Sequence, residues 1–224
     1  MKRVFDFTMA LIGLIVLSPV IIAVSIAIKL TSPGKILFSQ KRLTKGMKEF
    51  NIYKFRSMTS NEHREKGALQ IRGNSNEITP IGKFMRKTKI DEIPQLWNIL
   101  KGDMSFIGPR PELPRRLRYY SEEQKEIFKV RSGVSSPASI VFSDEEYIMN
   151  MVEDPEDFYI NQIMPYKIEL NLYYVRTRSF FNDIWMIIAT VLKIIGKVEN
   201  HQVVKDEELL QERERMLSEI GVEG

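Results

Sequence analysis

The chain has 224 residues, of which 43% are hydrophobic and 28% are charged, so it can bury a sizeable core and is not an intrinsically disordered chain. It has no cysteine, which excludes a disulfide framework and a thiolate zinc site. The formal net charge is only +4, but the positive charges are unevenly distributed.

A basic cluster follows the first apolar segment, with only Glu49 opposing it: Lys29, Lys35, Lys41, Arg42, Lys45, Lys48, Lys54 and Arg56. Such a cluster indicates an anionic partner, either lipid headgroups or a phosphorylated substrate. The sequence has no recognisable DNA- or RNA-binding motif, so nucleic acid is not an expected partner.

The first apolar segment, residues 7–28, contains no charged residue and predicts insertion into a membrane. An unbroken helix of this length would measure about 30 Å, enough to cross a bilayer. Pro19 removes the hydrogen bond to the Ile15 carbonyl and predicts a break, and Ser18 beside it can satisfy the freed carbonyl. Each arm, of about ten residues, is then too short to span.

Positive charges flank this segment on both sides, since Lys2 and Arg3 precede it and Lys29 and Lys35 follow it. Because positive charge marks the cytoplasmic side of a membrane, both ends are expected on that side. The pattern favours a re-entrant helix-break-helix over residues 1–31 that dips into one leaflet and returns. A kinked span, a secretory signal peptide and a buried helix of a soluble protein are the alternatives.

A small β-hairpin is predicted next, with strands at residues 35–42 and 49–58 joined by a turn that contains Gly46. Lys54 and Arg56 share one face of the second strand by alternation. They form either a two-point grip for phosphate or a pair of solvated strand charges.

Residues 89–112, KIDEIPQLWNILKGDMSFIGPRPE, carry the strongest functional signal. Pro94 fits only in the first turn of a helix, so Asp91 and Glu92 are expected at or before the helix N-terminus, where backbone N–H groups favour ionised carboxylates and bound anions. Arg110, between two prolines, is placed to hold a phosphate. The acidic pair alone is ambiguous, because solvated carboxylates at helix starts are common.

Around this block, residues 60–77 read as a polar surface loop or lid, and residues 80–87 as a short helix. Ser121 opens another predicted helix, because Gln124 lies at capping-box distance, and residues 132–133 end it.

Three further segments are predicted to be helical. Residues 154–178 begin with an Asp-Pro cap, and their recurring Tyr and Leu residues indicate packing. Residues 179–197 are strongly apolar, but their core at residues 184–195 is too short to span, which suits a helix at the membrane interface or an ordinary core helix. Residues 199–224 are a charged tail or an amphipathic partner helix, through which a homodimer is a further expectation.

The predicted fold is therefore mainly helical α+β, with a re-entrant membrane helix pair, a small β-hairpin and interfacial amphipathic helices. The predicted divisions are a membrane hairpin at residues 1–31, a catalytic domain at residues 32–198 and the charged segment at residues 199–224.

Five segments, in order, resemble landmarks of the bacterial sugar transferases of the monotopic phosphoglycosyl transferase type. They are KRVFDF followed by Ser18-Pro19, IKLTSPGKILFSQKR, KFRSM from Lys54, IDEIPQLWNILKGDMSFIGPRPE, and YYVRTRSFFNDIWMI. The likeness runs from residue 2 to about residue 197. Five motifs in the same order are specific evidence for the family, whereas any one of them alone would be weak evidence. The length resembles the minimal catalytic unit, without the additional transmembrane domain of larger relatives.

This resemblance implies a reaction in which a sugar 1-phosphate passes from a nucleotide diphospho-sugar, usually a UDP-sugar, to a polyprenyl phosphate such as undecaprenyl phosphate, with release of UMP and with Mg²⁺ as cofactor. It also implies membrane lipids as partners and a catalytic domain on the cytoplasmic face of the bacterial inner membrane, at the first membrane step of a glycan pathway such as capsule or O-antigen assembly.

By matching position, Asp91 is the implied nucleophile, which forms a covalent aspartyl-phosphosugar intermediate and shares in binding the metal, and Glu92 assists it. The implied phosphate contacts are the cations at family positions: Lys54, Arg56, Arg86 and Arg110.

One stretch departs from the family pattern. Many relatives read PGITG followed by a glycine-arginine pair, whereas this chain reads RSGVSSPASIVFSDEE from Arg131 and lacks that arginine. We expect a difference in specificity, with Arg131 or Arg118 as candidate replacements. A non-catalytic membrane scaffold and a membrane-proximal lipid phosphate hydrolase are the alternative functions.

Overall fold

The computed structural model describes residues 1–59 and 78–220, so the predicted loop at residues 60–77 lies outside the described part of the chain. The strands are β1 (Leu37–Thr44), β2 (Lys48–Phe55), β3 (Met104–Ile107) and β4 (Ser132–Ser135). The α-helices are α1 (Lys2–Val16), α2 (Ser18–Thr31), α3 (Pro80–Thr88), α4 (Gln95–Lys101), α5 (Pro137–Val141), α6 (Glu145–Met151), α7 (Pro155–Phe158), α8 (Met164–Thr177), α9 (Phe180–Ile194) and α10 (Glu207–Glu219). The mainly helical α+β fold class is confirmed.

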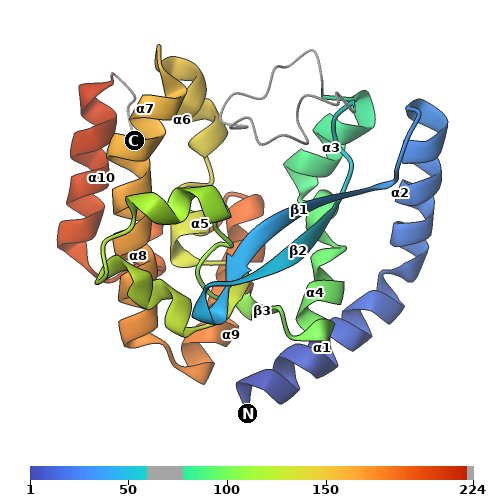
Figure 1. Ribbon diagram of the computed structural model, residues 1–224, viewed down its shortest axis with the longest axis horizontal. Helices are drawn as coiled ribbons and strands as arrows, with labels where there is room; N and C mark the ends of the chain where they lie inside the picture. The colour runs from blue at the N-terminus through green and yellow to red at the C-terminus, as the bar shows by residue number, and fades with distance from the viewer. Residues whose placement is uncertain (60–77, 221–224) are drawn as a thin grey trace.

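Helices α1 and α2 run along one side of the molecule, α8 and α10 lie on the opposite side, and the β1–β2 hairpin lies between them (Figure 1). The largest core forms around α8, which contributes Ile168, Leu170 and Leu172 to it. A smaller core lies between α1, β2 and α4, where Ala10 and Ile99 are fully buried.

The predicted interruption of the N-terminal apolar segment is present, because α1 and α2 meet at Leu17 with a bend of 60°. Ser18 Oγ donates a hydrogen bond to the Ile15 carbonyl at 2.7 Å, as its position beside Pro19 predicts. The arms have 15 and 14 residues and are longer than the expected ten, because the helix already begins at Lys2 and continues to Thr31. Within the described chain neither helix alone is long and apolar enough to cross a bilayer, whereas the bent pair together has the required length and hydropathy.

The β1–β2 hairpin is confirmed as an antiparallel pair, with Phe38 opposite Lys54. Gly46 in its turn has φ 69°, a conformation that glycine adopts without steric cost.

Strands β3 and β4 form a parallel pair that the sequence did not predict. Gly108 and Gly133 let their two backbones touch: the Gly108 N–H donates to the Ser135 carbonyl at 3.0 Å, and the Gly133 N–H donates to the Pro109 carbonyl at 2.9 Å. A Cβ atom on Gly133 would lie 2.1 Å from the Gly108 nitrogen, so this crossing accepts no side chain.

The prediction of a helix from Ser121 to residues 132–133 is partly wrong. The capping box exists, since Ser121 Oγ accepts from the Gln124 N–H at 3.1 Å and Gln124 Oε1 accepts from the Ser121 N–H at 3.0 Å. It closes the turn that leads into a short 3₁₀ helix at Gln124–Lys129, after which the chain extends into β4. Backbone pairing with β3 overrides the local helical pattern.

Other predicted helix starts are confirmed. Asp154 accepts hydrogen bonds from the Glu156 and Asp157 N–H groups before α7, and Ser179 accepts one from the Asn182 N–H before α9.

Helix α10 packs against α8, so the C-terminal segment shares the largest core. Met216 and Leu217 are buried, and Arg213 forms an ion pair with Asp144 at 2.6 Å. Much of the apolar face of α10 is thus used within the chain, and a homodimer through this segment stays a prediction.

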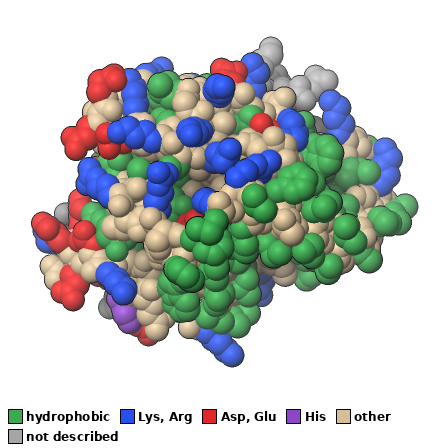
Figure 2. Space-filling model, turned by 90° about the horizontal axis from the view of Figure 1, so that it is seen from below, with side chains coloured by type: hydrophobic (Ala, Val, Ile, Leu, Met, Phe, Trp, Pro, Cys, Tyr) green, Lys and Arg blue, Asp and Glu red, His purple; other side chains and the backbone are tan. Residues whose placement is uncertain are grey.

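Three helices also present apolar side chains on the surface. Figure 2 shows hydrophobic side chains gathered on the underside of the molecule, where α1 and α9 lie. The exposed apolar face, as we term it, comprises Val4, Phe7, Leu11, Ile12, Ile15 and Val16 of α1, Ile22, Ile26 and Leu30 of α2, and Phe181, Trp185, Ile188, Val191, Ile194 and Ile195 in and directly after α9.

Candidate active site

The two adjacent carboxylates lie in a tight reversal between α3 and α4. After α3 ends, Lys89 adopts a left-handed conformation with φ 57°, and a 3₁₀ turn at Ile90–Glu92 follows. Pro94 directly precedes α4 instead of occupying its first turn. The prediction that Asp91 and Glu92 lie ahead of this helix is confirmed.

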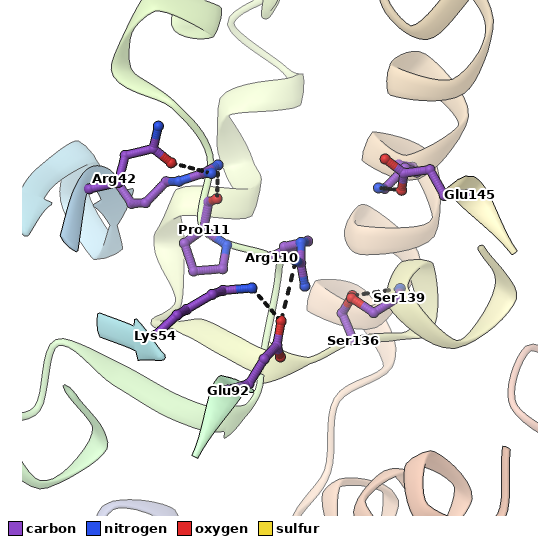
Figure 3. A network of polar contacts seen from close by, with 10 residues as sticks. Arg42, Lys54, Glu92, Arg110, Pro111, Ser136, Ser139 and Glu145 are labelled. Atoms are coloured by element: carbon purple, nitrogen blue, oxygen red, sulfur yellow. Dashed lines mark hydrogen bonds and ion pairs between the residues drawn. The ribbon is translucent and has the colours of Figure 1, made fainter. Parts of the chain in front are cut away.

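Glu92 is held by two cations from other elements. Lys54 of β2 contacts Glu92 Oε1 at 2.5 Å, and Arg110, which follows β3, contacts the same oxygen at 3.5 Å. Figure 3 shows both cations pointing toward the carboxylate. Burial alone would raise the pKa of Glu92, but Lys54 and Arg110 outweigh it and lower this pKa to about 2. Glu92 is therefore ionised at neutral pH.

Asp91 experiences a different environment from its neighbour. Its side chain is buried, and Oδ1 makes no hydrogen bond to any described residue. Burial raises the pKa of Asp91, an effect that the nearby Lys54 ammonium opposes and the Glu92 carboxylate reinforces. The expectation that the helix N-terminus governs this carboxylate is thus incomplete, because desolvation is the larger influence. A poorly hydrated, unpaired carboxylate is suited to act as a nucleophile.

Both carboxylates line a cavity of about 1680 Å³. Its wall also includes Leu17 at the bend between α1 and α2, and Ile194 at the end of α9. The cavity thereby connects the acidic pair with the two parts of the chain that carry the exposed apolar face.

Lys54 and Arg56 both line the cavity, but their side chains have different partners, so a shared grip on phosphate stays a prediction. Arg56 lies just beyond β2, and its guanidinium donates to the Pro33 carbonyl at 2.6 Å, the Ser32 carbonyl at 2.8 Å and Ser32 Oγ at 2.7 Å. Arg56 therefore binds the backbone and Ser32 side chain directly after α2, whereas Lys54 contacts Glu92. Alternation along a strand cannot predict this, because the partner of Arg56 comes from a different part of the fold.

Arg86 and Arg110 both line the cavity, as their predicted role requires. Arg86 lies in the last turn of α3, and its positive charge lowers the pKa of Asp91. Arg118 stacks on Tyr119, and Arg131 donates to the Gly102 carbonyl at 3.0 Å. Neither Arg118 nor Arg131 is part of the cavity wall, so neither replaces the missing family arginine there.

Sequence reasoning missed a second polar group on the cavity wall, formed by Glu145, Lys167 and Asn171. Lys167 and Asn171 occur one helical turn apart on α8, among the apolar residues Met164 and Ile168 that also line the cavity. A cation within an apolar helical face was the available signal, since charged residues are seldom buried without a partner.

The carboxylate pair can supply a magnesium ligand, although it cannot bind the ion alone. The described residues contain no group of three or more His, Cys, Asp or Glu side chains that could hold a metal alone. Mg²⁺ commonly binds through one or two carboxylates together with substrate phosphates, and the unpaired Oδ1 of Asp91 is a suitable ligand.

The fold and the site define a class of protein: a mainly helical α+β protein with an exposed apolar face and a buried carboxylate pair in a cavity lined with cations. Comparison with known proteins then gives the family, because residues 1–197 match the model of the bacterial sugar transferases. The chain belongs to the bacterial sugar transferase family.

Three curated relatives illustrate the similarity. A UDP-N-acetylgalactosamine-undecaprenyl-phosphate N-acetylgalactosaminephosphotransferase of Aeromonas hydrophila is 36% identical over 201 residues, which cover 87% of this chain and 43% of the relative. A UDP-glucose:undecaprenyl-phosphate glucose-1-phosphate transferase of Escherichia coli is 33% identical over 197 residues, covering 86% of this chain and 40% of the relative. The uncharacterized sugar transferase EpsL of Bacillus subtilis is 34% identical over 195 residues, which cover 87% of this chain and 87% of the relative. The chain therefore spans about two fifths of the length of the first two relatives and most of the length of the third.

Proposed function

We propose that this protein transfers a sugar 1-phosphate from a UDP-sugar to a polyprenyl phosphate such as undecaprenyl phosphate, and so begins assembly of a lipid-linked bacterial glycan. The observation that carries the proposal is the contrast between two adjacent carboxylates. Asp91 is buried with an unpaired oxygen, and Glu92 beside it is fixed by Lys54 and Arg110. The relatives named for this reaction with UDP-glucose or UDP-N-acetylgalactosamine support the substrate class.

The proposed first step is attack by an Asp91 carboxylate oxygen on the phosphorus that bears the sugar. A bond forms between this oxygen and phosphorus while the diphosphate bridge breaks, and the bridging oxygen leaves with UMP. The aspartyl-phosphosugar so formed is attacked in the second step by a phosphate oxygen of the polyprenyl phosphate. This attack releases the Asp91 carboxylate and gives the polyprenyl diphospho-sugar.

Cations around the carboxylates can stabilise the charge that develops on the phosphates. Lys54, Arg86 and Arg110 line the cavity together with Asp91, and guanidinium groups offer phosphate a bidentate contact. A magnesium ion bound by Asp91 and the diphosphate oxygens would neutralise the leaving UMP. Because the pKa of Glu92 is as low as about 2, this group is a poor proton acceptor at neutral pH. Its role in the proposal is to hold Lys54 and Arg110 beside Asp91.

The proposed setting is the cytoplasmic face of the bacterial inner membrane, with α1 and α2 as a re-entrant pair. The flanking positive charges, the 60° bend and the exposed apolar face support it. Because the chain has no native cysteine, Lys2→Cys and Lys35→Cys variants give background-free labelling in sealed vesicles. Both sites should react from the same side, and reaction from opposite sides would show that α1 and α2 form a kinked span.

The chemistry is tested by measuring UMP release from UDP-sugars with polyprenyl phosphate and Mg²⁺ present. Asp91→Asn should lower the rate by at least about 10³-fold, because an amide cannot act as the nucleophile, whereas Asp157→Asn on the exposed surface of α7 should leave it unchanged. Without the lipid acceptor, the unmodified protein should gain the mass of a sugar phosphate and Asp91→Asn should not. Normal turnover by Asp91→Asn would refute the nucleophile assignment.

A lipid phosphate hydrolase could use the same groups, and product analysis separates the two functions. The transferase yields a sugar diphospholipid and UMP, whereas the hydrolase yields inorganic phosphate.

A further inference from the structure

The cavity that contains Asp91 has a second polar wall that the proposed chemistry does not use. Lys167 of α8 donates a hydrogen bond to Glu145 Oε2 at the start of α6, and both side chains line the cavity. Glu145 makes only this side-chain hydrogen bond among the described residues, which leaves its Oε1 as an acceptor. About a third of the Glu145 side chain is exposed.

Asn171 provides a separate observation at the same wall. It lies one turn beyond Lys167 on α8, only 5% of it is exposed, and its Oδ1 has no hydrogen-bond partner among the described residues. A buried polar atom without a partner destabilises a protein by about 1–3 kcal/mol, so an unpaired amide on a cavity wall indicates a group that a ligand satisfies.

The Glu145–Lys167 ion pair supports the same reading. Buried ion pairs contribute little net stability, because desolvation offsets the attraction, and apolar residues of similar volume can replace them. Lys167 lies 5.6 Å from the centre of the Tyr159 ring, on which Arg116 also stacks at 4.2 Å. We therefore expect this pair to contribute little to stability.

The wall adjoins the reacting centre through Arg110. In Figure 3, Arg110 points toward Glu92, and Glu145 lies on the other side of Arg110. The carboxylates of Glu92 and Glu145 both raise the pKa of Arg110. Arg110 is thus the cation shared by the carboxylate pair and this wall.

We propose that Glu145, Lys167 and Asn171 form a binding subsite for the hydroxyl- and amide-bearing part of the donor that adjoins its diphosphate. Glu145 accepts hydrogen bonds from hydroxyl groups, Lys167 fixes Glu145 and donates to ligand oxygens, and the Asn171 amide pairs with a polar ligand group. This inference rests on the proposed function, because it identifies how the same cavity holds a nucleotide diphospho-sugar. The sugar ring and the uridine both carry this chemistry.

The variants Glu145→Gln, Lys167→Met and Asn171→Leu test the subsite by steady-state UMP release, with the UDP-sugar and the polyprenyl phosphate varied separately. Each should raise KM for the UDP-sugar about tenfold, the loss expected for one hydrogen bond to a charged or buried group, with kcat and KM for the lipid nearly unchanged. Glu169→Gln, on α8 but outside the cavity wall, is the matched control and should have no effect.

Product inhibition by UMP identifies which part of the donor is bound. If the inhibition constant of UMP rises with KM, the subsite holds the nucleoside, and if it does not change, the subsite holds the sugar. Either result supports the proposal.

Two outcomes would overturn it: an unchanged KM in folded variants, or a parallel change in kcat, both KM values and the melting temperature, which indicates a purely structural role. The double variant Glu145→Gln/Lys167→Met leaves no unpaired buried charge and is the form to measure where a single variant does not fold. Measuring the Kd of UDP-sugars for the unmodified protein and the variants gives the same comparison without turnover. The subsite proposal can therefore fail or hold independently of the proposed transfer reaction.

Discussion

Asp91 and Glu92 are neighbours in the chain, yet their surroundings move their pKa values in opposite directions. Desolvation dominates at Asp91, whereas Lys54 and Arg110 dominate at Glu92. Pairs of titratable groups whose environments separate their pKa values are typical of active sites. Here the separation distinguishes Asp91, which we propose as the nucleophile, from Glu92, which holds Lys54 and Arg110.

The acid limb of the pH–rate profile should report Asp91, which must be ionised to attack. Because Lys54 favours the ionised form, Lys54→Met should raise the pKa of Asp91 and move this limb to higher pH. Glu92 disfavours that form, so Glu92→Gln should move the limb to lower pH. Measuring kcat/KM against pH for both variants checks the signs, and shifts in the same direction would contradict the assignment of this limb to Asp91.

Arg56 should contribute to stability more than to substrate binding. Arg56→Met removes three hydrogen bonds from the chain after α2, and we expect a loss of about 4 kcal/mol or more in the free energy of unfolding, because each hydrogen bond to a charged group contributes a net of about 1.5–3 kcal/mol. KM for the UDP-sugar should not change in the folded protein. Arg110→Met is the contrasting variant and should raise this KM. A raised KM for Arg56→Met with an unaltered melting temperature would return Arg56 to the phosphate contacts.

The sequence predicted some residue environments and not others, for a physical reason. The position of Asp91 and Glu92 before a helix depends on local proline chemistry, which can be read from adjacent residues. The partners of Arg56 and the exposure of Lys167 and Asn171 to the cavity depend on contacts between segments far apart in the chain. Local patterns do not specify those contacts.

At the scale of elements, the same distinction separates the hairpin from the β3–β4 pair. The β1–β2 hairpin was predictable because its strands alternate and its turn contains Gly46. Strands β3 and β4 are four residues each and pair in parallel across distant parts of the chain, so neither has a local pattern of its own. Their only sequence signal is one glycine directly after β3 and one within β4, and glycine is common in loops.

The glycine crossing between these strands should tolerate no side chain. Gly133→Ala would place a Cβ atom 2.1 Å from backbone, which must shift, and we expect destabilisation of about 3 kcal/mol or more. Gly196→Ala is the control, because it has open space and costs only the strain of its positive φ, about 1 kcal/mol. Thermal unfolding of both variants checks the difference, and equal melting temperatures would show that the backbones are not in contact.

For the molecule as a whole, the exposed apolar face of α1, α2 and α9 determines where the protein can reside. Exposed apolar side chains on this scale mark an interaction surface, and the flanking positive charges suit anionic lipids. The cavity wall includes Ile194 of this face and Leu17 beside it, which places the proposed site of transfer next to the surface that we expect to contact lipid.

Removing apolar area from α9 should weaken membrane binding. We expect Ile188→Ser and Val191→Ser each to lower partitioning into anionic phospholipid vesicles about tenfold, since burying such a side chain contributes about 1.5–3 kcal/mol. Tyr147→Ser removes an exposed aromatic ring on α6 and should have little effect. Sedimentation with vesicles measures the change, and unaltered binding of the α9 variants would place the contact elsewhere.

The ion pair between Lys2 and Asp183 joins residues 181 positions apart, and it has a consequence for biosynthesis. At 5–20 residues per second, a ribosome needs roughly 10–40 s to make the chain between these two residues. During that interval α1 has already left the ribosome, while the α9 residue that anchors its first turn does not yet exist. The apolar α1–α2 pair is therefore complete well before this ion pair can form, and we expect lipid to stabilise the pair in the meantime.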